Sequence, residues 1–168
     1  FYDYGEVVTL TAIADPGWSF GGWGGDASGL ENPISLTVTN DLSISATFTQ
    51  DEYTLSVSIN PPEQGTVTIT PIKPFYHYGD VVTLTATPAP GWSFANWTGD
   101  ATGTSNPVSV TITGDTSITA NFTQNEYALT VTVDPENSGT VSLDPDQDTY
   151  HYGDVVTLTA TPELGWSF

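Results

Sequence analysis

The sequence predicts an all-β protein made of a tandem array of small modules, which share one length and have about six strands each. Three observations support this prediction. Long segments recur at a fixed spacing, apolar and polar residues alternate with a period of two, and turn-forming pairs such as Pro-Gly and Gly-Asp separate the alternating runs. Such alternation is typical of strands with one buried and one solvent-exposed face. No part of the sequence shows the period of about 3.6 residues that indicates a helix.

The repeat is clearest in a segment of 20 residues that occurs three times, as 1–20, 75–94 and 149–168. The two steps between these copies are equal in length, and 15 of 20 positions are identical between the first two copies. Between the last two copies, 17 of 20 positions are identical. A fixed period is the signature of a modular array, in which every period is one structural unit.

The same period defines the expected domain boundaries. If a unit begins at Tyr53, the chain holds the C-terminal part of one repeat at 1–52, a complete repeat at 53–126 and the N-terminal part of the next at 127–168. Both ends of the sequence then fall inside repeats. We therefore expect these 168 residues to be a window on a longer array.

Within the complete repeat, each alternating run predicts one strand. The expected strands cover 53–59, 66–70, 80–87, 108–113 and 117–123, with a sixth and shorter strand around Trp92, Phe94 and Trp97. In the first run, the apolar residues Tyr53, Leu55 and Val57 alternate with Thr and Ser. Thr is favoured on the exposed face of a sheet because its side chain is β-branched and polar.

Composition and charge exclude several classes of protein. The net charge is −19, and Lys73 is the single basic residue against 20 Asp and Glu, so we expect no nucleic-acid partner. The sequence has no Cys, which excludes disulfides and thiolate metal ligands. It also lacks a run of about 18 apolar residues, so we expect no membrane insertion. With 38% hydrophobic and 12% charged residues, the chain is expected to fold.

The ordered motifs of the complete repeat resemble the divergent InlB B-repeat family. They are Tyr-Gly-Asp-Val-Val-Thr-Leu-Thr-Ala-Thr-Pro at 78–88, Gly-Trp-Ser-Phe-Ala-Asn-Trp at 91–97, Gly-Asp at 99–100, Asn-Pro-Val-Ser-Val-Thr-Ile at 106–112 and Ile-Thr-Ala-Asn-Phe at 118–122. The resemblance covers the whole chain. It implies a compact β module, β-grasp-like or a small sandwich, in tandem-repeat proteins of the prokaryotic cell surface, without catalytic residues.

We expect a structural role outside the cell. Repeats joined by short connectors would form a fibre, beaded filament, stalk or adhesin shaft, and a strand of one module would complete the sheet of the next. The expected partners are the neighbouring repeats and other copies of the same protein. The alternative is a carbohydrate-binding module, in which Trp23 and Trp97 would stack on the sugar rings of surface glycans, although such large aromatic residues also suit the core of a small module.

The sequence contains one candidate metal site. Asp144, Asp146 and Asp148 form the D-x-D-x-D opening of a calcium loop, but the Gly that should follow is replaced by Thr149. No other cofactor is expected. The recurrent acidic residues stand beside Gly in turns, where Asp bonds the backbone, so we expect no enzymatic activity.

Glycosylation is the remaining candidate modification. Asn96 and Asn121 are acceptors in the sequons Asn-Trp-Thr and Asn-Phe-Thr. Alternation places Asn121 on the outward face of its strand. The two histidines, His77 and His151, each lie between two tyrosines and are expected to be local features of a strand end.

Overall fold

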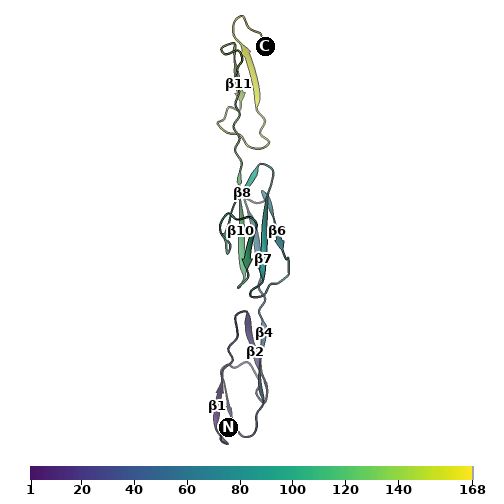
Figure 1. The fold of residues 1–168 in the computed structure, drawn as a ribbon, viewed down its shortest axis with the longest axis vertical. Coiled ribbons are helices and arrows are strands. Elements are labelled where there is room, and N and C mark those ends of the chain that lie inside the picture. The colour runs from purple at the N-terminus through teal and green to yellow at the C-terminus, as the bar shows by residue number, and fades with distance from the viewer. Residues whose placement is uncertain (168) are drawn as a thin grey trace. The chain divides into compact units, whose positions relative to one another are not determined.

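The computed structural model describes residues 1–167, which form twelve strands and no helix (Figure 1). The strands are β1 Val7–Leu10, β2 Trp18–Gly25, β3 Ile34–Thr37, β4 Ile44–Gln50, β5 Leu55–Asn60, β6 Gly65–Thr70, β7 Val81–Pro88, β8 Trp92–Gly99, β9 Val108–Thr111, β10 Thr116–Gln124, β11 Gly139–Asp144 and β12 Thr157–Pro162. The predicted all-β class is confirmed. Within the described residues, no helix is long and apolar enough to span a membrane.

The complete repeat contains six of these strands, β5 to β10, in two three-stranded sheets. The strand orders are β5-β10-β8 and β6-β7-β9. Each predicted strand is present, and the ends of the five strands expected with bounds lie within two residues of those bounds. The strand around Trp92 was expected to be short, but β8 has eight residues, as many as β7. It is longer because it pairs with β10, which has nine residues, and continues through Trp97.

The first and last strands of the complete repeat run parallel to each other. Three pairs of side chains connect these strands or the residues just before them: Thr54 with Asp115, Ser58 with Thr119, and Asn60 with Asn121. The two partners are 61 residues apart in every pair. A constant separation is possible only when both strands run in the same direction, since in an antiparallel pair it would change along the ladder. A parallel pair requires a long crossover, which the other four strands provide here.

The core of the complete repeat lies between its two sheets. The five largest side chains with less than 2% exposure are Trp97, Leu84, Ile112, Ile118 and Val82. Phe122 on β10 reaches Gly65 on β6, where an added Cβ would lie 2.5 Å from the ring. Facing sheets that share one core correspond to the small sandwich, one of the two arrangements expected from the sequence.

The first repeat has the same strand pairing as the complete repeat, but with fewer strands. β1 pairs with β3 and β2 pairs with β4, both antiparallel, in the way that β7 pairs with β9 and β8 with β10. The segments that would correspond to β5 and β6 are not among the 168 residues. As a result Val8 and Leu10 are half-buried, whereas their equivalents Val82 and Leu84 are fully buried. In the third repeat, β11 pairs with β12.

Close contacts group the chain into two compact units. One contains Phe1–Val57, Ile69–Leu84 and Pro107–Ile118. The other contains Ser58–Thr68, Thr85–Asn106 and the residues from Thr119 onward. Each unit therefore combines a partial repeat with part of the complete one, and β5, β6, β7 and β10 contribute residues to both.

Candidate functional site

The tryptophan expected to stack on sugars in the complete repeat lies in the core. Trp97 has no exposed surface, its Nε1 donates to the carbonyl of Ser105 at 2.9 Å, and its ring centre is 5.0 Å from that of Phe94. In the first repeat, Trp23 is half-buried and donates in the same way to Glu31 at 2.8 Å. Because Trp97 has no exposed surface, its ring offers no face to a sugar.

The two predicted glycosylation sites lie close together on the outer face of the sheet. Asn121 is half-buried, and its Nδ2 donates to the carbonyl of Asn96 at 3.3 Å and to Oγ1 of Thr98 at 3.1 Å. Its Oδ1 accepts a hydrogen bond from Asn60 at 3.0 Å. A glycan attached to Nδ2 of Asn121 would compete with its two donated bonds. Glycosylation at either asparagine remains a prediction.

The three aspartates of the predicted calcium loop are exposed. Asp144 is the last residue of β11, and Asp146 and Asp148 follow in the loop. Across residues 1–167, no group of three His, Cys, Asp or Glu side chains is arranged to hold a metal ion. Calcium binding by this loop also remains a prediction.

A tyrosine organises this loop, a role that was not expected from the sequence. The hydroxyl of Tyr150 donates to the carbonyl of Pro145 at 2.9 Å and accepts from the N–H of Gln147 at 3.3 Å. Tyr76 makes the same two contacts in the complete repeat, with Pro71 and Lys73. The signal in the sequence was the return of this tyrosine one repeat period later.

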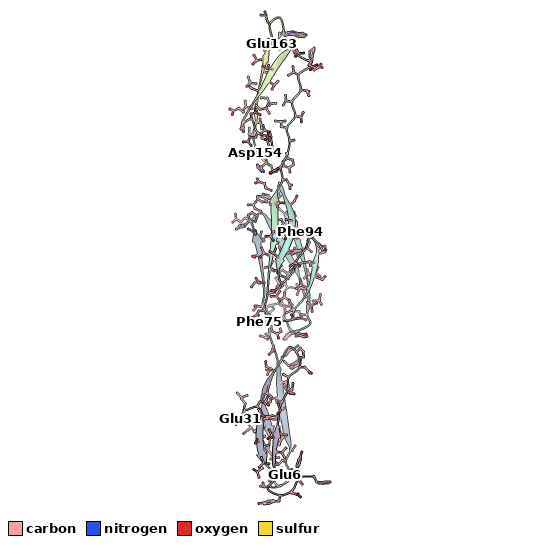
Figure 2. All side chains as sticks on the ribbon, turned by 90° about the vertical axis from the view of Figure 1, so that its left-hand side faces the viewer. Glu6, Glu31, Phe75, Phe94, Asp154 and Glu163 are labelled. Atoms are coloured by element: carbon pink, nitrogen blue, oxygen red, sulfur yellow. The ribbon has the colours of Figure 1, made fainter. Side chains whose placement is uncertain are left out.

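The recurrent acidic residues hold the turn before each repeat's central strand. Glu6, Asp80 and Asp154 each accept a bond from the backbone N–H three residues earlier, at 2.7 to 3.0 Å. Figure 2 labels the first and third of these side chains. In the complete repeat the donor is His77, and Asp80 also pairs with Lys73 at 2.9 Å. These carboxylates are occupied by backbone and ionic contacts.

An asparagine clamp joins a loop to a strand in two of the repeats. Nδ2 and Oδ1 of Asn106 bond the carbonyl and N–H of Ala86, at 2.7 and 2.9 Å. Asn32 binds Ala12 in the same way in the first repeat. The pairing of β7 with β9 stops at Leu84, so the amide of Asn106 continues the hydrogen-bonding ladder beyond the last paired residue.

The connector after each of the first two repeats is bonded to the turn that precedes β2 or β8. The N–H of Asp51 donates to the carbonyl of Gly17 at 2.8 Å, and Oγ of Ser19 donates to Asp51 Oδ1 at 2.6 Å. At the next connector, Asn125 makes the equivalent bonds to Gly91 and Ser93, at 2.8 and 2.6 Å. The same geometry thus forms with either an aspartate or an asparagine.

The acidic side chains predict a loss of stability at low pH. Bonds from the N–H and hydroxyl of Thr54 lower the pKa of Asp115, and the bond from Lys73 is the main cause that lowers the pKa of Asp80. A carboxyl whose folded pKa is depressed stabilises the fold above its unfolded pKa, and this stability is lost as the pH falls through the folded value. We expect the urea midpoint to fall between about pH 5 and about pH 2.

The variant Asp115→Asn tests this expectation, because it removes one of the depressed carboxyls. Its midpoint should lie below that of the parent at neutral pH and converge with it in acid. A difference between the two that stays constant across the titration would contradict the prediction.

The complete repeat thus has a buried core, and hydrogen bonds hold the turns of the repeats and the connectors between them. The family model of the divergent InlB B-repeat domain matches the chain in three segments, 1–52, 55–126 and 129–168. No curated protein and no solved structure matches the chain. The second and third matched segments begin at 55 and 129, two residues after the repeat starts that the sequence period gives at 53 and 127.

Proposed function

Because the chain belongs to the divergent InlB B-repeat family, a family of bacterial surface repeats, we propose that it is a structural protein of the outer surface of a prokaryotic cell. In this proposal, the repeats are the beads of a fibre, filament, stalk or adhesin shaft. The proteins that they contact are neighbouring repeats and further copies of the same chain. The role is mechanical: the array spans distance or projects a partner away from the surface.

One observation carries this proposal, the parallel pairing of β5 with β10. Since the first and last strands of the repeat run in the same direction, the chain enters the module at one end and leaves it at the other. Had the two strands been antiparallel, entry and exit would lie at the same end. A module with entry and exit at opposite ends extends an array by its own length each time it is repeated.

The burial pattern supports the same role. The complete repeat encloses its own core, in which Val82, Leu84, Trp97, Ile112 and Ile118 have less than 2% exposure. The stability of such an array is approximately the sum of module terms and of terms between neighbours. Local unfolding of one module would therefore leave the remainder of a fibre intact.

Immunogold electron microscopy tests the proposed role. Antibodies raised against the 168-residue chain would be applied to intact cells that produce the protein. We expect gold particles outside the cell, in rows along thin projections, and the same cells without the gene serve as control. Label confined to the cytoplasm of sectioned cells would overturn the proposal.

A more specific form of the proposal involves strand complementation. In the complete repeat, β5 and β6 cover the outer edges of β10 and β7. In the first repeat, the equivalent edges of β4 and β1 have no such neighbours, and apolar side chains line a groove there, namely Val8, Leu10, Leu36 and Ile44. A segment with the sequence of β5 and β6 carries alternating apolar side chains that suit this groove.

A synthetic peptide tests the complementation. We expect a peptide of residues 53–72, which contains β5 and β6, to bind the 168-residue chain and raise its thermal midpoint. At a concentration of 100 times Kd, a ligand of the folded state adds about 2.7 kcal/mol of stability. The control peptide carries Val57→Asp and Val67→Asp, which place carboxylates on the buried face.

An equal effect of the two peptides, or no effect of either, would refute the complementation. The surface role would survive such a result, because each repeat of an array can supply these strands from its own sequence. A second control is the chain with Leu10→Asp, whose groove should no longer take the parent peptide.

The alternative function, carbohydrate binding, would require an exposed aromatic ring. Trp18 is 43% exposed, and this is the observation that favours the alternative. In the complete repeat, however, the equivalent Trp92 is half-buried and Trp97 is fully buried. We expect no binding when the chain is screened on a glycan array. Binding that is lost in Trp18→Ala would establish the alternative.

A further inference from the structure

The connector between the first and second repeats is held from both sides. Asp51 is bonded to Gly17 and Ser19 of the first repeat. Tyr53 exchanges two backbone hydrogen bonds with Tyr76 of the second repeat, at 2.8 and 2.9 Å. A single residue, Glu52, separates the two anchored positions. A flexible linker needs several free residues, and this connector does not provide them.

The connector after the complete repeat has the same construction. Asn125 is bonded to the preceding repeat, and Tyr127 exchanges two backbone bonds of 2.8 Å with Tyr150 of the following one. Glu126 is the one residue between them. Two junctions with different connector sequences thus adopt one geometry.

A second contact crosses each junction beside the connector. The Cα of Gly17 lies so close to Tyr78 that an added Cβ would overlap the Cβ of the tyrosine. Gly91 and Tyr152 form the same contact at the next junction. Both glycines have positive φ, +80° and +79°, and they form the turn that also binds the connector.

Positions for which the 168 residues include no neighbouring repeat supply an internal comparison. Gly165 is the third copy of this glycine and has a φ of +89°, but an added Cβ would meet nothing within 4 Å. Tyr4 is the first copy of the tyrosine and is 84% exposed, whereas Tyr78 is 46% and Tyr152 is 65% exposed. The close contact therefore forms where a glycine turn and a following tyrosine are both present, and is not a property of either residue alone.

We propose that the glycine turn of one repeat is a docking surface for the Tyr78-type tyrosine of the next repeat, and that this contact and the bonded connector together form an ordered joint. The partner of the surface is the following repeat of the same chain. Gly is required in the turn because any side chain there would occupy the position of the tyrosine and also strain the backbone. The joint limits bending between repeats, whatever the array carries.

Distance measurements between spin labels test this proposal directly. The chain has no Cys, so the substitutions Thr37→Cys and Thr111→Cys introduce the two labelled thiols without background. Both positions are exposed, and they are equivalent residues in β3 and β9 of successive repeats. We expect a narrow distribution of distances in this parent and loss of the narrow peak in Tyr78→Ala.

Two matched controls separate the joint from general effects of substitution. Tyr4→Ala removes the same side chain at a position for which the 168 residues include no preceding repeat, and should leave the narrow peak unchanged. Gly17→Ala should broaden the distribution, whereas Gly165→Ala introduces the same backbone strain without a neighbouring tyrosine and should not. Circular dichroism of every variant verifies that the strands remain folded.

Two results would overturn the proposal. One is a broad distribution in the labelled parent, which would show that the connector bends freely. The other is a narrow peak that survives Tyr78→Ala in a folded variant, which would show that the tyrosine does not restrict the joint. Neither result bears on whether the array is displayed at the cell surface.

Discussion

Replacement of Trp97 by alanine is expected to destabilise the complete repeat by about 3–5 kcal/mol. The residue has no exposed surface and lies at the centre of the core, so its removal leaves a large cavity and an unpaired carbonyl on Ser105. Small domains have total stabilities of about 5–15 kcal/mol, and the variant would therefore be close to unfolding. Urea titration followed by circular dichroism measures the change.

Two further variants make this prediction specific. Trp97→Phe retains an aromatic ring but loses the Nε1–H donor, and should cost less than the alanine variant. Trp18→Ala truncates a tryptophan that is partly exposed, and a surface substitution of this kind is expected to change stability by about 0.5 kcal/mol or less. Equal midpoints for Trp97→Ala and Trp18→Ala would show that the core does not depend on Trp97.

The second large effect is expected at the asparagine clamp. In Asn106→Ala, the N–H and carbonyl of Ala86 lose the partners that they have at 2.9 and 2.7 Å. Ala86 is 4% exposed, so water has little access to these groups. A buried backbone group without a partner costs about 1–3 kcal/mol. Hydrogen exchange of the Ala86 amide and urea unfolding would both report the loss.

The first repeat offers a matched control for the clamp. Asn32 makes the same two bonds to Ala12, which is only half-buried because fewer strands surround it. Water can replace the lost partners there, and Asn32→Ala should cost less than Asn106→Ala. A larger effect at Asn32 would contradict the argument from burial. Asn106→Asp retains the acceptor for Ala86 N–H but directs a carboxylate at the Ala86 carbonyl, and should also destabilise the repeat.

Much of the strand content was predictable because apolar residues, which become buried, alternate with exposed polar residues along each strand. Val82, Leu84 and Ala86 alternate along one run of the sequence, and all three are buried in β7. Local alternation determines which side of a strand faces the core, so it can be read without knowing the neighbours. The pairing of β5 with β10 depends on residues 61 positions apart, and local pattern carries no information about it.

The tyrosines around His77 show where alternation fails. Tyr76 and Tyr78 are two positions apart and would share one face of a regular strand. In the structure, Tyr76 is buried and holds a loop, whereas Tyr78 lies at the surface against the preceding repeat. The chain leaves the strand conformation here, with Gly79 at a φ of +85°, so the two side chains separate. After a turn, the alternation of the preceding residues no longer determines which face of the sheet the next side chain occupies.

The recurrence of one junction geometry has a consequence for how the gene can evolve. Recombination between neighbouring copies of the 20-residue segment that starts at positions 1, 75 and 149 would add or delete one whole repeat period. Such an event changes the copy number and preserves every turn, connector and docked tyrosine. An insertion within a connector, in contrast, would separate its two bonded positions, such as Asp51 and Tyr53. The number of repeats can therefore change in whole periods, without a new contact at any junction.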